Sequence, residues 1–209
     1  MNRKNFLQTL VEIEEVYVRQ KVEIAELFGY ESRNRYSIQT GDGREFGHCK
    51  EPRLDWQNAL MRQFFGHWRT FDLIGTDHLG QNAFHAHHPH RWFMQHLDLF
   101  SSGDRYLGCL QQRFAWLEKK FDYIDAQGRT IATMTSPIWH PWIFPVNQGS
   151  RKIAVIEKKW SGALKEIFTD ADNFRVKFID PKLTSDQKLL LLASAIFVDF
   201  LYFERAASS

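Results

Sequence analysis

The densest group of residues that could bind a metal ion lies in the segment 84–92, which reads FHAHHPHRW and holds four of the nine histidines. If this segment is a strand, His85 and His87 share one face and offer two ligands for a Zn²⁺ ion at its edge. No third ligand follows at a recognisable spacing, and Pro89 interrupts a strand, so we favour an exposed polar loop at residues 85–90. A pH-sensitive basic patch is a further alternative, because histidine titrates near neutral pH.

Lysine and tryptophan residues occur together further along the chain, and this combination suits contact with an anionic lipid headgroup. Each basic residue near such a surface contributes roughly 1 kcal/mol, and tryptophan prefers the headgroup level. The alternative, which we favour, is that Trp142 and Trp160 pack inside the protein and the lysines form a solvated face. The residues concerned are Lys158, Lys159, Trp160 and Lys165, with Lys152, Trp139 and Trp142 nearby.

Covalent catalysis is not expected from this sequence. Ser161-Gly162 and Asp199 have no nucleophile elbow around them, and the chain shows neither a phosphate-binding loop nor a dinucleotide fingerprint. The 209 residues carry 27 basic and 25 acidic side chains, a formal charge of +2. This near balance of charges excludes a protein that consists mainly of a strongly basic nucleic-acid-binding arm or an acidic tail, and no nucleic-acid partner is expected.

The cysteine count and the first residues predict a cytoplasmic protein. Cys49 and Cys109 are too few for a disulfide framework, so we expect two buried, reduced thiols. The acidic residues Glu12 and Glu14 arrive before any apolar signal segment could form.

The elements that must position these residues are mainly strands. Apolar residues alternate with polar ones at Val16 and Val18, and again from Phe174 to Phe178, as in half-buried strands. Turn signals such as Asp42-Gly43 recur roughly every 8–12 residues, which favours an all-β barrel or sandwich. Residues 1–15 form a separate N-terminal segment that Phe6 and Leu10 predict to be helical.

Residues 189–203, which read LLLLASAIFVDFLYF, are apolar on every side of a helix. The run is shorter than the roughly 20 residues that span a bilayer, and it contains Asp199, so we predict a buried helix at 186–203. Thr184 or Ser185 would cap its start. A barrel around this helix would bury Leu190, Ile196, Phe197 and Phe200.

The run from Lys159 to Phe174 (KWSGALKEIFTDADNF) closely resembles the signature of the phospholipid scramblase family, and Phe197 to Glu204 resembles the end of that family. Residues 31–36 and 107–112 resemble its weaker landmarks. The resemblance implies a mostly β fold: a closed antiparallel barrel of about twelve strands around a hydrophobic C-terminal helix, shared with Tubby-like and LURP-one-related proteins. The barrel domain would cover residues 16–205, with a tail at 206–209. The chain lacks the Pro-rich extension and the cysteine cluster for palmitoylation of animal scramblases.

The resemblance implies ATP-independent, bidirectional movement of phospholipids between leaflets, with calcium as a candidate stimulant and cofactor. It places a calcium segment at Asp170, where Asp172 and Asn173 add oxygen ligands and Asp180 is a more distant fourth. The segment departs from an EF-hand, since Arg175 stands where that loop needs glycine. A turn in which these side chains bond nearby backbone N–H groups is the alternative that we favour.

Two other functions stay open at this level. One is a soluble Tubby-like module that binds or tethers anionic lipids without transport, and the other is a barrel that binds a peptide or protein partner. In each lipid-related case the partners are phospholipids or a membrane surface, and the expected location is peripheral, at the inner face of the plasma membrane.

Overall fold

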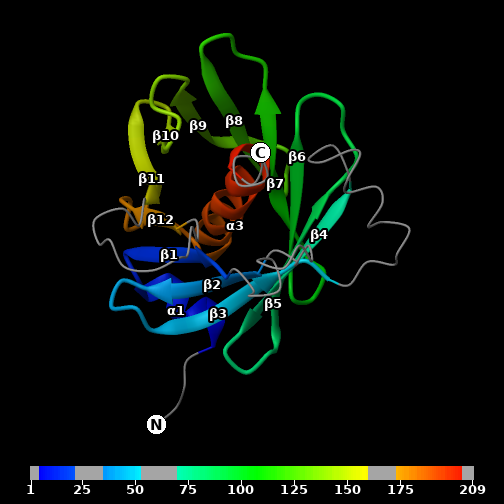
Figure 1. Cartoon of the computed structure of the whole chain (residues 1–209), viewed down its shortest axis with the longest axis vertical. Coiled ribbons are helices and arrows are strands. Elements are labelled where there is room, and N and C mark those ends of the chain that lie inside the picture. Colours follow the sequence, from blue (N-terminus) through cyan, green and yellow to red (C-terminus); the bar gives the residue numbers. More distant parts are fainter. Residues whose placement is uncertain (1–4, 22–34, 53–69, 160–172, 204–209) are drawn as a thin grey trace, which may run out of the picture.

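The computed structural model describes residues 5–21, 35–52, 70–159 and 173–203, and it shows a closed antiparallel barrel with a helix inside (Figure 1). Each strand pairs with its neighbours in the sequence, and β1 closes the barrel by pairing with β12 as well as β2. The predicted fold class, a twelve-stranded barrel around a C-terminal helix, is therefore confirmed. The strands are β1 (Glu15–Gln20), β2 (Arg35–Thr40), β3 (Glu45–Lys50), β4 (Phe71–Asp77), β5 (Asn82–His88), β6 (His96–Ser101), β7 (Tyr106–Arg113), β8 (Glu118–Asp125), β9 (Thr130–Pro137), β10 (Ile143–Gln148), β11 (Arg151–Lys159) and β12 (Asn173–Phe178).

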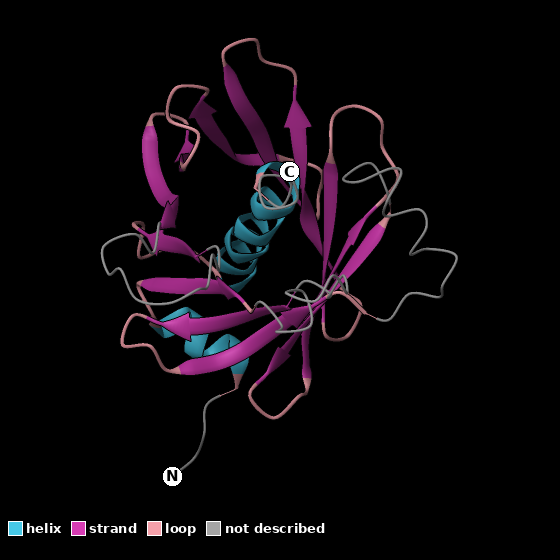
Figure 2. Cartoon of the chain, in the orientation of Figure 1, coloured by secondary structure: helices cyan, strands magenta, loops and turns pink. Residues whose placement is uncertain are grey.

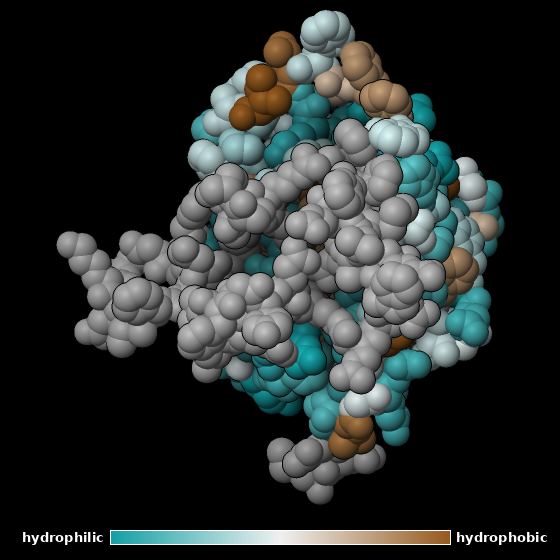
Figure 3. Space-filling view, turned by 45° about the vertical axis from the view of Figure 1, so that its right-hand side comes forward, coloured by the Kyte–Doolittle hydropathy of each residue, from teal (hydrophilic) through white to brown (hydrophobic). Residues whose placement is uncertain are grey.

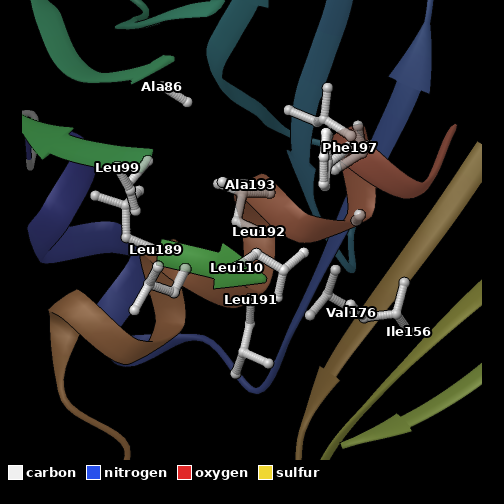
Figure 4. Packing of buried hydrophobic residues seen from close by; sticks show 14 of the residues in the cluster. Ala86, Leu99, Leu110, Ile156, Val176, Leu189, Leu191, Leu192, Ala193 and Phe197 are labelled. Carbon is white, nitrogen blue, oxygen red and sulfur yellow. The ribbon is translucent and has the colours of Figure 1, made fainter. Parts of the chain in front are cut away.

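The helix inside the barrel, α3 (Ser185–Tyr202), is enclosed along its length (Figure 2). Thr184 caps its start through a capping box with Gln187, and every residue from 188 to 201 is buried. In Figure 4, Leu191, Leu192 and Phe197 lie among side chains from the surrounding strands. The four residues predicted to be buried, Leu190, Ile196, Phe197 and Phe200, are at most 4% exposed.

Two hydrogen bonds fix the rotation of α3 within its apolar surroundings. The Tyr36 hydroxyl of β2 donates to Asp199 Oδ2 at 2.9 Å, and the Tyr123 hydroxyl of β8 lies 2.7 Å from Ser194 Oγ. Burying polar groups is costly unless they are paired, so these bonds favour one orientation of an otherwise featureless apolar helix.

The N-terminal segment contains a short helix, α1 (Phe6–Glu12), that packs against the barrel through Phe6 and Leu10. Lys188 of α3 donates from Nζ to the carbonyl oxygens of Leu10, Val11 and Ile13 at 2.7–3.2 Å. The last carbonyls of a helix have no partner within it, so this ammonium group caps the end of α1.

The two ends of the barrel differ. Tight hairpins, including the one predicted at Asp42-Gly43, close the end at which α3 begins. The described connections 89–95, 114–117 and 138–142 lie at the other end, near the last residues of α3. Among the described helices, none combines the length and apolar character that a membrane span requires.

Candidate functional site

Exposed apolar side chains gather at the end of the barrel where α3 finishes. Three other large exposed apolar residues of the described chain, Val11, Leu79 and Ile179, lie elsewhere. Figure 3 shows brown and tan apolar residues at the top of the molecule, beside a mainly teal surface. We call the exposed apolar residues at this end of the barrel the apolar rim. They are Trp92, Phe93, Phe114, Trp116, Leu117, Ile138, Trp139, Trp142 and Ile143.

Backbone hydrogen bonds join the connection 138–142 to the connection 114–117, and the connection 89–95 to strand β7. The Ile138 N–H donates to the Leu117 carbonyl at 3.2 Å, and the Gln112 N–H donates to the Gln95 carbonyl at 2.8 Å. Residues 114–117 (FAWL) form a short connection in which three of four side chains are large and apolar, although such connections are normally polar. A cluster of exposed apolar side chains of this kind is typical of a contact site for a membrane, a ligand or another protein.

Beneath the rim lies an open cleft of about 380 Å³. Phe93 and Phe114 of the rim line it, together with Arg113 of β7, Lys119 of β8 and Tyr202 at the end of α3. The cleft thus combines aromatic side chains with two cationic groups.

Lys119 is the cation of this cleft that lacks an ion-pair partner among the described residues. Its Nζ lies 3.6 Å from the centroid of the Tyr202 ring, and burial lowers its pKa to about 8. Glu118 also lines the cleft, but no charged group contributes to that shift. Arg113 differs, because its Nε pairs with Asp122 Oδ2 at 3.3 Å. Lys119 is therefore the group best placed to meet an incoming anion.

The lysines predicted from the sequence to contact lipid are buried, ion-paired or outside the described residues. Lys158 is buried, with Nζ 3.8 Å from the centroid of the Phe203 ring. Lys159 is exposed and pairs with Glu157 Oε2 at 2.7 Å. Trp160 and Lys165 lie outside the described residues.

Lys119 and Lys158 together place two cations over the aromatic rings that end α3. The last turn of α3 contains no basic residue of its own. Positive charge is favourable at the C-terminus of a helix, so both lysines also complement its dipole.

The tryptophans of the rim correct one sequence interpretation. Trp142 was interpreted as packed inside the protein, but it lies in the connection 138–142 and is exposed, as is Trp139. The sequence of this connection, in which tryptophan stands beside proline, did not show whether Trp142 is packed inside the protein or exposed.

The residues predicted to bind calcium are not all brought together. Asp170 and Asp172 lie outside the described residues. Asn173 begins β12, and its buried Oδ1 has no hydrogen-bond partner in the described part of the chain. Asp180 follows the opposite end of β12, where it accepts from Lys182 N and Arg151 Nη2. Asp180 follows Asn173 by seven residues of nearly extended chain, which is roughly 20 Å, so these two side chains cannot share an ion.

The histidine segment was interpreted as an exposed polar loop, and this is wrong for residues 85–88, which belong to β5. His85 and His87 do share the outer face of the barrel. Asp72 of β4 supplies the partner that spacing could not reveal, since its Oδ1 lies 2.9 Å from His85 Nε2 and 2.8 Å from His87 Nδ1. The register pairs Asp72 with His87, and register is not readable from one segment alone.

Comparison with known proteins places these features in a family. A family model described as Scramblase matches residues 1–205. The chain is 27% identical to phospholipid scramblase 2 of Homo sapiens over 95% of this chain and 70% of that protein. It is 26% identical to phospholipid scramblase 1 of Mus musculus, covering 97% of this chain and 65% of that one. Altered inheritance rate of mitochondria protein 25 of Saccharomyces cerevisiae is 24% identical, with 91% and 70% covered. The chain thus spans about two thirds of the length of these relatives, and no solved structure matches it significantly.

Proposed function

The chain belongs to the scramblase family, and on this premise we propose that it moves phospholipids in both directions between membrane leaflets without ATP. We also propose that it meets the membrane with the apolar rim. The observation that carries this proposal is the apolar rim surrounding a cleft that holds Lys119, a cation without an anionic partner in the described chain.

The chemistry of this end suits the boundary between headgroups and acyl chains. The aromatic and aliphatic side chains of the rim would enter the outer few ångströms of the bilayer, where tryptophan is favoured. The Lys119 ammonium, held beneath them, would meet a lipid phosphate at the same depth. The phosphate is the one anionic group that all glycerophospholipids share, so this contact favours broad headgroup tolerance.

The barrel interior does not offer a lipid path, because α3 and the apolar cores of the strands fill it. Lipid movement would therefore occur outside the barrel, where the inserted rim disturbs headgroup packing and lowers the barrier for headgroup passage. On this proposal the connections at one end of the barrel carry the activity, and the strands are their rigid support.

Calcium is proposed as a stimulant through oxygens that include Asn173. The side-chain oxygen of Asn173 is buried and accepts no hydrogen bond within the described residues, which is unfavourable unless another group meets it. Asn173 also starts a strand at the same end of the barrel as the rim, so an ion there would lie near the membrane contact.

The test is the movement of a fluorescent phospholipid in proteoliposomes, with calcium and with a chelator. We expect wild-type protein to accelerate flip in both directions and Lys119→Gln to slow it severalfold. Lys120→Gln is the matched control, since Lys120 is the next residue of β8 and lines an outer groove, away from the ring of Tyr202. Flip at the rate of empty vesicles, with the protein bound and folded, would overturn the proposed transport.

A second candidate function is lipid binding or tethering without transport. It is favoured by the filled barrel, which supplies the surface for contact without an internal path. Vesicle binding that depends on Lys119 but is accompanied by no flip, with and without calcium, would establish this function instead.

A further inference from the structure

The outer face of the barrel carries a second site, distinct from the rim. We propose that His96, Asp98 and Cys109 bind a Zn²⁺ ion between β6 and β7. One ligand atom from each of the three residues lies within 4.8 Å of the others.

The sheet brings these residues together by register. Asp98 lies directly opposite Cys109 in the antiparallel pair β6–β7, and directly opposite residues place their side chains on the same face. His96 precedes Asp98 by two residues and so shares that face as well. The neighbouring residues Leu97 and Leu99 point into the core instead. The spacing 96, 98 and 109 matches no familiar zinc motif, which is why sequence reasoning did not find the site.

The ring of His96 is held in the orientation that a metal ligand needs. Gln111 Nε2 donates to the carbonyl oxygens of Met94, Gln95 and Gln112 at 3.0–3.3 Å, which fixes the amide so that its oxygen faces His96. Gln111 Oε1 lies 2.8 Å from His96 Nδ1, so Nδ1 must carry a proton and donate it. Metal-binding histidines are commonly held in this way by a hydrogen bond from the far ring nitrogen.

That bond leaves His96 Nε2 facing Asp98 Oδ1 at 2.9 Å. In the neutral ring this places a nitrogen lone pair against a carboxylate oxygen, which is repulsive. A positive charge between the two atoms removes the repulsion, and either a proton or a metal ion can supply it.

Cys109 decides in favour of a transition metal over a proton alone. Its sulfur completes a nitrogen, oxygen and sulfur donor set, which suits Zn²⁺ and does not suit Ca²⁺ or Mg²⁺. Zinc needs its ligands at about 2.0–2.3 Å, so tetrahedral ligand atoms lie roughly 3.3–3.8 Å apart, and small side-chain rotations achieve this here. Burial raises the pKa of the Cys109 thiol, so the bound ion must displace its proton.

The site also has a place for a fourth ligand and a link to the rim. The side chains of His96 and Asp98 are 14% and 26% exposed, so water can reach the ion from outside. Gln111, which orients His96, also holds the carbonyls of Met94 and Gln95 in the connection that carries Trp92 and Phe93. Zinc would therefore stiffen one segment of the rim as well as joining two strands.

The test uses chelator-treated full-length protein titrated with Zn²⁺ by calorimetry and with Co²⁺ by absorption. We expect one ion per chain, a thiolate-to-cobalt charge-transfer band, and a higher thermal midpoint with zinc. Cys109→Ser should abolish the band, and Cys109→Ser and Asp98→Asn should each weaken zinc binding about tenfold or more. Thermal melting in the presence of chelator shows whether each variant folds. If Cys109→Ser does not fold, Asp98→Asn still tests the site, because asparagine has nearly the same shape as aspartate.

Three controls separate this site from others in the chain. Cys49→Ser should keep the band, because Cys49 is buried in the core. His85→Gln should keep zinc binding, because His85 belongs to the pair that shares Asp72. Asn173→Ala should keep zinc binding as well, so the test of the zinc site is independent of the proposed calcium site. Undiminished binding in folded Cys109→Ser and Asp98→Asn, or loss only in His85→Gln, would overturn the proposal.

Discussion

Trp116 is the most exposed member of the apolar rim, at 85% of its surface, and replacing it measures how much the rim contributes to membrane contact. A tryptophan side chain buries about 200 Å² when enclosed, so Trp116 offers about 170 Å² to a bilayer. At about 25 cal/mol per Å², complete burial is worth about 4 kcal/mol. Insertion of about half this area at the interface gives about 2 kcal/mol, which is about a 30-fold change in partitioning.

We therefore expect Trp116→Ser to weaken binding to phospholipid vesicles about 30-fold, measured by flotation at a salt concentration high enough to screen charges. Leu79→Ser is the matched control, because Leu79 is 63% exposed but lies in the hairpin between β4 and β5, at the other end of the barrel. Both substitutions change solvent-exposed side chains and should leave the free energy of unfolding nearly unchanged. Equal losses of binding for the two variants, or no loss for Trp116→Ser, would refute the assignment of the rim as the membrane contact.

Three further predictions concern the interior of the barrel, the N-terminal helix and the cleft. Phe197→Ala leaves a cavity at a fully buried position of α3 and should lower the free energy of unfolding by about 3–5 kcal/mol in a denaturant titration, whereas Phe93→Ala on the rim should change it by less than about 0.5 kcal/mol. Lys188→Ala removes three charge-assisted bonds to the end of α1 and should cost about 3 kcal/mol, and a loss near zero would contradict the capping role. Because burial lowers the pKa of Lys119 to about 8 from 10.5, this ammonium loses its charge as the pH rises through about 8. Binding to anionic vesicles should therefore weaken between about pH 7 and pH 9. Lys119→Arg should remove this pH dependence, because arginine stays charged. Binding by the wild-type protein that does not change with pH would count against a role of Lys119.

Much of the fold could be predicted from the sequence, because the alternation of the strands and the all-round apolar character of the C-terminal helix are unambiguous. The alternation at Val16 and Val18 and from Phe174 to Phe178 marks strands, and these two segments prove to be the neighbours β1 and β12 that close the barrel. The run at 189–203 is apolar on all sides, so it required enclosure wherever it lay. Closure itself could not be derived from periodicity, because the contact between the first and last strands is long-range.

The site was less predictable, because its residues meet only through the tertiary structure. Sequence reasoning favoured Lys158 and Lys159 for their closeness to Trp160, whereas the structure draws attention to Lys119 through its contact with Tyr202. Alternation separates Lys119 from Lys120 by face, but it does not show what either lysine meets. Lys119 lies on the same face of β8 as the buried residues Phe121 and Tyr123, but its contact with Tyr202 at the end of α3 is long-range. The one local signal was the apolar connection at residues 114–117, whose composition contradicts its position between two strands.

The enclosure of α3 also determines how the protein could act on a bilayer. If α3 left the barrel to enter the membrane, its own apolar side chains would move into hydrocarbon, but the strand side chains that surround it would face water. Nine fully buried ones of this kind are Val16, Val18, Ile38, Leu73, Leu99, Phe121, Phe144, Phe174 and Val176. At about 1.5–3 kcal/mol each, exposing these nine would cost about 14–27 kcal/mol, compared with the roughly 5–15 kcal/mol that stabilises a whole domain. The barrel would not survive such a step, and the connections at its end must make the contact instead. Amide hydrogen exchange across residues 189–201 should accordingly be as slow with saturating vesicles as without them, while exchange that accelerates on membrane binding would show that the helix is released.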